Sequence, residues 1–161
     1  MSKPKKGKKF LYSLDALKKV RHIKEKKEQE ELIRAEQLVI QERQKEFQFR
    51  AEQDEHYNHF EELLASDFVP SLNIIQMNQI HMKKLEEKVN TQKEEVKKAE
   101  DYKESQKEKL VEAMKEKKII DKDHDKTKEK WKKMMDKEDA KFLDELGEIS
   151  FTRNKIETDL T

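Results

Sequence analysis

The feature that most constrains this chain is a long span almost without turn residues. Between about residue 10 and residue 146 there is no glycine, and Pro70 is the only proline. Proline removes a backbone donor, clashes with the preceding helical turn and disfavours the helical region for the residue before it. Ser66 or Asp67 can end one helix, and Pro70 or Ser71 can begin the next. The sequence therefore predicts two long helices joined by one bend at residues 66–71, a connection that favours an antiparallel hairpin.

The composition agrees with this prediction. Charged residues make up 45% of the chain, hydrophobic residues 33%, and Gly and Pro occur twice each. That is typical of long helices and coiled coils rather than of a globular core. Disorder is the alternative for so charged a chain, but the apolar residues recur at helical spacing. We predict an all-α fold, a long two-helix antiparallel coiled-coil hairpin whose C-terminal helix is the longer.

The expected boundaries follow from the turn residues. Residues 1–9 form a basic flexible tail, the hairpin spans 10–150 and a polar tail covers 151–161. Within the hairpin, helix one runs from about 10 to 65 and helix two from about 71 to 150, with Gly147 ending or fraying it. At 1.5 Å per residue these helices measure about 80 Å and about 120 Å, which leaves about 20–25 residues of helix two without a partner helix.

Both helices carry apolar stripes. In helix one the stripe is interrupted, and we expect it to resume at seven-residue spacing with Ile33, Ile40 and Phe47. Helix two is more regular, and an a/d pattern of this kind is typical of coiled coils. Its apolar seam positions are Ile75, Met82, Leu85, Val89, Val96, Ala99, Leu110, Ala113, Ile120, Trp131 and Met134. Its polar seam positions, which cost stability, are Asn78, Gln92, Lys103, Gln106, Lys117, His124 and Thr127.

The unpaired part of helix two is rich in large apolar side chains. It should lie near residues 127–151 and includes Trp131, Met134, Met135, Phe142, Leu143, Leu146, Ile149 and Phe151. Uncovered apolar stripes of this size usually mark interaction sites. Charge is also uneven, at +9 over residues 1–27 and −8 over residues 28–67, against +1 for the whole chain. Such asymmetry influences partner choice and encounter rate rather than fold.

Several chemistries find no support in the sequence. Two glycines, Gly7 and Gly147, cannot build a phosphate-binding loop, and the chain has no cysteine. His56 and His59 could hold a metal ion from one helix face, but structural metal sites need a closed ligand set, and a solvated polar face is the simpler interpretation. The many carboxylates lie on helix faces without a cleft that could perturb them. We expect no enzyme activity, no catalytic residue, no cofactor and no metal.

Nucleic acid and membrane are not the expected main partners. The tail between Lys3 and Lys9 could contact phosphates, but aromatic residues are few and the net charge is near zero. No apolar run approaches transmembrane length, and no apolar signal region follows the basic N-terminus. We expect a soluble, cytoplasmic protein without a transmembrane segment.

Two end segments resemble the FliJ family of flagellar type III export proteins. Residues 9–21 (KFLYSLDALKKVR) are similar to its opening aromatic-x-aromatic-x-Leu pattern followed by a basic residue, although the next leucine, Leu17, comes after three residues instead of four. Residues 138–146 (EDAKFLDEL) resemble its C-terminal Lys-x-Leu-Asp-Glu-Leu region. Chain length, a bend in the first half and a longer second helix also match.

This resemblance implies a stalk similar to that of rotary ATPases, which binds the hexameric export ATPase, FliI, and the export gate protein, FlhA. Some members also bind export chaperones. The ATPase-facing residues would be Phe10, Tyr12, Leu14, Leu17, Arg21, Phe142, Leu143, Asp144 and Leu146. The gate-facing residues would be Tyr57, Phe60, Leu64, His81 and Leu85. Such a protein would lie at the cytoplasmic face of the inner membrane when bound to the export apparatus.

Other interpretations share the same architecture. The stalk could serve a virulence-type secretion system, or the chain could be a generic coiled-coil adaptor or chaperone. Phe10, Leu14 and Leu17 could also simply pack against helix two, and Trp131 could fold back in a self-associated dimer. A stalk should be monomeric, whereas an adaptor would more often dimerise through its seam.

Overall fold

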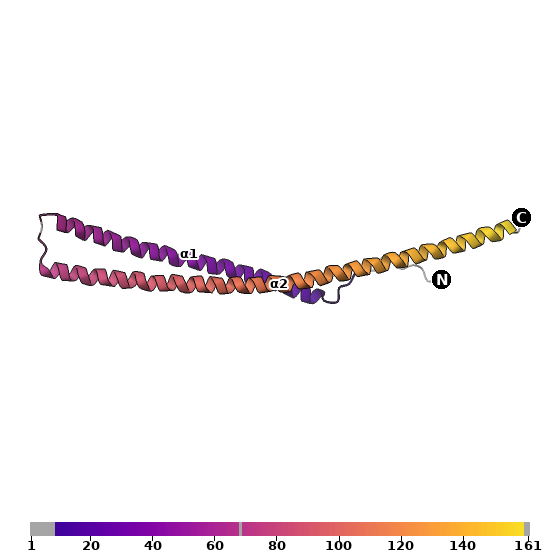
Figure 1. Ribbon diagram of the computed structural model, residues 1–161, viewed down its shortest axis with the longest axis horizontal. Helices are drawn as coiled ribbons and strands as arrows, with labels where there is room; N and C mark the ends of the chain where they lie inside the picture. Colours follow the sequence, from indigo (N-terminus) through magenta and orange to yellow (C-terminus); the bar gives the residue numbers. More distant parts are fainter. Residues whose placement is uncertain (1–8, 68, 160–161) are drawn as a thin grey trace. The chain divides into compact units, whose positions relative to one another are not determined.

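The computed structural model describes residues 9–67 and 69–159. Within these ranges it consists of two α-helices and no strand, α1 (Asp15–Ala65) of 51 residues and α2 (Leu72–Asp159) of 88 residues. Figure 1 shows both helices joined by a single connection. The all-α prediction with a longer second helix is therefore confirmed. No helix in the described ranges is long and apolar enough to cross a membrane.

The chain divides into two compact units. The first, here called the bend unit, comprises residues 24–114 and contains the connection between the helices. The second, here called the terminal unit, combines the N-terminal part, described for residues 9–23, with the C-terminal part, described for residues 115–159.

In the bend unit the two helices pack antiparallel through a heptad seam. Three side-chain pairs across the helices show that α1 and α2 run in opposite directions: Arg43–Glu100, Glu52–Lys88 and His56–Asn78. As the residue number in α1 rises, the residue number of its partner in α2 falls. The buried residues of α2 in this unit follow steps of four and three and then of seven: Leu85, Val89, Gln92, Val96, Ala99, Gln106 and Ala113. Lys103 and Leu110, which divide the last two steps into four and three, are half-buried. These are the seam positions that the sequence of helix two predicted, buried glutamines included. The coiled-coil interpretation of α2 is confirmed here.

The seam of α1 differs from the prediction. Its buried residues are Ala35 and Val39, with Leu32 half-buried on the same face. Ile33, Ile40 and Phe47 lie outside the seam, with 49%, 56% and 74% of their surface exposed. Both sets repeat every seven residues, so spacing alone does not choose between them. The packed structure distinguishes the two sets, because only Ala35 and Val39 are buried.

In the terminal unit the seam of α2 continues and then shifts. Ile120 is buried, and Lys117, His124, Thr127 and Trp131 are half-buried at the predicted positions. At the next step Met134 is 51% exposed, and Met135 is half-buried instead. A straight helix drifts by about 20° per heptad relative to a 3.5-residue repeat. Beyond the contact with α1 nothing imposes the tighter repeat, which explains the one-residue shift.

Both outer helix boundaries differ from the expected ones. Helix α1 begins at Asp15 rather than near residue 10, because the preceding residues pack on α2 in another conformation. Helix α2 continues through Gly147 to Asp159, so the expected polar tail is helical over residues 151–159. One glycine costs a helix about 1 kcal/mol, and the helix formers around it outweigh that cost. The expected basic tail lies outside the described residues except for Lys9.

The connection between Ala65 and Leu72 has recognisable helix ends. The Ser66 hydroxyl donates to the carbonyl of Leu63 at 2.7 Å, which satisfies an acceptor at the end of α1. The backbone N–H of Ile75 donates to the carbonyl of Ser71 at 3.2 Å. Ser71 therefore holds the capping position at the start of α2, and Pro70 lies just outside the helix.

Candidate interaction surfaces

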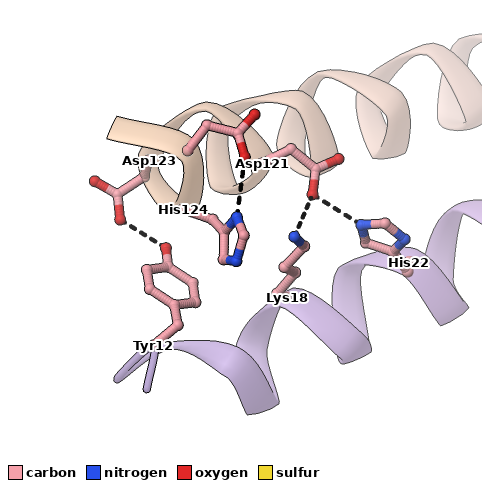
Figure 2. A network of polar contacts seen from close by, with 7 residues as sticks. Tyr12, Lys18, His22, Asp121, Asp123 and His124 are labelled. Carbon is pink, nitrogen blue, oxygen red and sulfur yellow. Dashed lines mark hydrogen bonds and ion pairs between the residues drawn. The ribbon is translucent and has the colours of Figure 1, made fainter. Parts of the chain in front are cut away.

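The N-terminal segment packs against α2 in the terminal unit. The Tyr12 hydroxyl donates a hydrogen bond of 2.6 Å to Oδ2 of Asp123, as Figure 2 shows. The rings of Phe10 and Tyr12 meet the ring of His124 nearly at right angles, with centroids 5.5 and 5.0 Å apart. Phe10 also lies 5.7 Å from Trp131. Two predicted partner-binding residues, Phe10 and Tyr12, are thus engaged by the chain itself.

The environment of Tyr12 keeps its hydroxyl protonated. Desolvation, the hydrogen bond to Asp123 and the charges of Asp123 and Asp121 raise the pKa of Tyr12 to about 12. The Tyr12 hydroxyl is therefore a permanent donor at neutral pH.

In the first two turns of α1, a polar network joins α1 to α2. Asp121 accepts a 2.9 Å hydrogen bond from His22 and lies 3.6 Å from Nζ of Lys18 (Figure 2). The hydrogen bond from His22, followed by the charges of His22 and Lys18, keeps the pKa of Asp121 below its ordinary value. Arg21 pairs with Glu116. The Arg21 guanidinium, predicted to face the ATPase, is thus held by α2.

Other predicted ATPase-facing residues are accessible. Leu14 and Leu17 are 41% and 39% exposed, and Asp144 is also exposed. Phe142, Leu143 and Leu146 are 39%, 66% and 45% exposed on α2. With 100° of rotation per residue, Trp131, Met135, Phe142, Leu146 and Ile149 fall within an arc of about 60°. We call these five residues the C-terminal apolar face.

In the bend unit, three of the predicted gate-facing residues line one groove. Tyr57, Phe60 and Leu64 of α1 line it together with Asn78 and Met82 of α2. Tyr57 and Leu64 are 57% and 49% exposed.

The other two predicted gate-facing residues are placed differently. His81 contacts His56 with ring centroids 4.3 Å apart and lines a neighbouring groove with His59. Leu85 is 4% exposed and packs in the seam, so it can support this surface only from beneath.

His56 and His81 of the bend unit contact each other, and His56 also contacts α2 through Asn78. Nε2 of His56 lies 2.8 Å from Oδ1 of Asn78 across the helix pair. Among the described residues, no group of three or more His, Cys, Asp or Glu side chains is placed to hold a metal ion.

Sequence reasoning missed an apolar surface on the outer side of α1. Ile40 and Phe47 line a shallow groove there with Arg43, Gln44 and Gln48. The signal that could have revealed it is the heptad register of the residues nearer the bend. Counting back in steps of four and three from Phe60 through His56, Phe49 and Glu42 leads to Val39 and Ala35, not to Ile33 or Ile40.

These features define a class of protein, a helical hairpin with exposed apolar and polar side chains along its helices. A family model described as Flagellar FliJ protein matches residues 12–155. The chain therefore belongs to the FliJ family, which is a family of flagellar export components. Searches among curated proteins and among solved structures found no significant match.

Proposed function

We propose that this chain is the non-enzymatic stalk that couples the export ATPase ring to the export gate of the flagellar type III export apparatus. Family membership across residues 12–155 carries the proposal. The exposed apolar residues of the terminal unit and of the bend unit supply two separate binding surfaces. In this role the protein works in the cytoplasm, at the inner face of the membrane when bound to the apparatus. Export chaperones are further candidate partners.

The ATPase surface we propose combines residues from both helices of the terminal unit. Its apolar part is formed by Leu14 and Leu17 on one side and by Phe142, Leu143 and Leu146 on the other, all between 39% and 66% exposed. Tyr12 and Lys18 contact α2 at Asp123 and Asp121, so the two groups lie about 30 Å apart along α2. We propose that one extended partner surface spans both, since uncovered apolar side chains usually mark interaction sites. Asp144 and Arg21 supply the polar rim in this proposal. In the free chain, Arg21 is paired with Glu116.

The test is ATP turnover by the cognate export ATPase with and without this protein. We expect the wild-type chain to stimulate turnover and hexamer formation, and the double variant Leu143→Ala/Leu146→Ala to lose at least about tenfold in apparent affinity, because hot-spot side chains typically cost over 1 kcal/mol each. The matched control is Ile33→Ala/Ile40→Ala, which removes equally exposed apolar residues from the bend unit. Normal turnover and no complex with the wild-type chain would exclude the ATPase stalk.

The gate surface we propose is the groove of the bend unit that Tyr57, Phe60 and Leu64 line. A Tyr57→Ala/Leu64→Ala variant should lose binding to the cytoplasmic part of the gate protein while still stimulating the ATPase. The control Tyr102→Ala/Val111→Ala removes side chains that are 43% and 44% exposed elsewhere on α2. Equal loss in both variants would indicate a general apolar effect and argue against this groove.

A coupling role needs no chemistry from the chain itself. The carboxylates with resolved pKa shifts, such as Asp15, Glu42, Asp121 and Glu129, are all shifted downwards by hydrogen bonds and ion pairs. A general acid or base at neutral pH needs a shift in the opposite direction. These shifts support a structural rather than a catalytic role for the four carboxylates.

A further inference from the structure

The segment before α1 contacts α2 through the rings of Phe10 and Tyr12. Phe10 and Tyr12 face α2, while Leu11 between them is 85% exposed, the alternation expected of an extended segment. Two ring contacts with His124, one with Trp131 and one hydrogen bond with Asp123 are the interactions described for this segment. Residues 9–12 are here called the strap.

The strap covers one end of the C-terminal apolar face. Trp131 is the first residue of this face, and Phe10 lies against it. Trp131 is half-buried, whereas Leu146 and Ile149 further along the face are 45% and 53% exposed. A partner that uses the whole face must therefore take the place of Phe10 on Trp131.

We propose that the strap is an autoinhibitory contact, which occupies the Trp131 end of the apolar face in the free chain and is displaced when the export ATPase binds. The inference rests on the proposed function, because it takes the ATPase as the partner of this face. It assigns Phe10 and Tyr12 a role in the free chain that opposes partner binding rather than adding to it. Release of the strap uncovers the part of the Trp131 side chain that Phe10 contacts.

The first test follows the strap directly. The chain has no cysteine and a single tryptophan, so a Phe10→Cys variant carries one bimane label at the position whose ring centroid lies 5.7 Å from that of Trp131, and contact with tryptophan quenches this label. Tyr12 keeps its hydrogen bond to Asp123 in this variant and holds the strap on α2. We expect the label to be quenched in the free chain and bright in a matched Phe10→Cys/Trp131→Phe control. Addition of the ATPase should restore the fluorescence of the Phe10→Cys chain to the level of this control.

The outcomes separate the inference from the proposed function. ATPase binding with the label still quenched would overturn the displaced strap and leave the stalk proposal standing. A failure of the ATPase to bind either labelled chain or the unlabelled wild type would overturn both. A label that is equally bright in the free chain and in the Trp131→Phe control would show that the strap is not docked and overturn the inference by itself.

The second test uses the sign of an affinity change. If the strap competes with the ATPase, the Phe10→Ala/Tyr12→Ala variant should bind the ATPase roughly three- to tenfold more tightly than the wild type. This is the factor expected when the strap leaves Trp131 uncovered in about one third to one tenth of the free wild-type molecules. Weaker binding would show that Phe10 and Tyr12 contact the ATPase and would overturn the inference. Leu11→Ala, which truncates the outward side chain of the same strap, should leave the affinity unchanged. Circular dichroism of each variant checks that both helices are intact.

Discussion

At the scale of single residues, the bend unit is held by small and polar side chains as much as by large apolar ones. Gln92 is buried and donates both to the carbonyl of Glu42 at 3.1 Å and to its carboxylate at 2.5 Å. Ala35 lies one heptad before Glu42 and Ala99 one heptad after Gln92, and both are almost fully buried. A buried position filled by alanine leaves little room for a larger side chain.

Ala35→Leu should therefore destabilise the protein. Ala35 has no exposed surface, and overpacking a filled position typically costs about 1–3 kcal/mol. The measurement is urea unfolding followed by circular dichroism. Ala51→Leu, the same change at an exposed site of α1, should shift the free energy of unfolding by no more than about 0.5 kcal/mol. Equal stability of wild type and Ala35→Leu would refute this packing of the seam.

The network around Asp121 should make stability depend on pH. The pKa of Asp121 is lowered in the folded chain, so its ionised form stabilises the fold above the unfolded pKa of about 3.9, and this contribution is lost as pH falls through the folded value. Asp121→Asn should cost about 0.2–1 kcal/mol near pH 7, as for other partly exposed ion pairs. In thermal unfolding, the difference in melting temperature between wild type and Asp121→Asn should disappear as pH falls below about 4. Asp136→Asn, the same change at an exposed position of α2, controls for the effect of the amide itself on stability at pH 7. A difference between wild type and Asp121→Asn that stays the same from pH 7 to pH 2 would contradict the role of the Asp121 charge.

At the scale of elements, the two helices use their sequences differently. Helix α2 follows a regular seam through both units and continues past it to Asp159. Helix α1 carries two sets of apolar residues at heptad spacing. Ala35 and Val39 are buried in the seam, whereas Ile40 and Phe47 are exposed. Its N-terminal end is set by the strap, because Phe10 and Tyr12 contact α2 only if the backbone before Asp15 is not helical.

Gly147→Ala tests the continuity of α2. A Cβ at this position meets nothing within 4 Å, and glycine in a helix costs about 0.5–1 kcal/mol relative to alanine. We expect slower hydrogen exchange of the amides around residue 147, by a factor of roughly two to five. Ser105→Ala, elsewhere on α2, should leave these amides unchanged. Faster exchange in Gly147→Ala would show that the glycine allows a bend that the chain requires.

At the scale of the whole molecule, the charge is balanced overall, with 37 basic and 36 acidic residues, but divided along the sequence. Each unit is held by its own cross-helix contacts, such as Arg43–Glu100 in the bend unit and Lys18–Asp121 in the terminal unit. The seam is thus occupied within one chain, and the exposed apolar side chains lie beside it or beyond it.

The free protein should accordingly be a monomer. Multi-angle light scattering should give a mass near 19.5 kDa, because the heptad positions that would drive dimerisation are already covered by the other helix. Leu146→Glu, which places a charge on the C-terminal apolar face, should not change this mass. A concentration-dependent mass near twice the monomer value would favour a coiled-coil adaptor over a stalk.

The sequence by itself determined the two helices, the bend at residues 66–71, the seam of α2 from Leu85 to Trp131 and the family resemblance of the two ends. These are local or periodic properties, and the absence of glycine and the single Pro70 leave little choice. The groove formed by Tyr57, Phe60 and Leu64 brings together three of the five residues named for the gate.

Only the tertiary structure decided which heptad of α1 faces α2, where α1 begins and what Phe10 and Tyr12 contact. Ile33 and Leu32 are equally good seam residues by period, and the choice depends on how closely the partner helix approaches. The strap depends on side chains more than 110 positions apart in the chain, Tyr12 and Asp123 among them. A local sequence pattern cannot predict such a contact, because the contact stabilises the chain only after the two helices have paired.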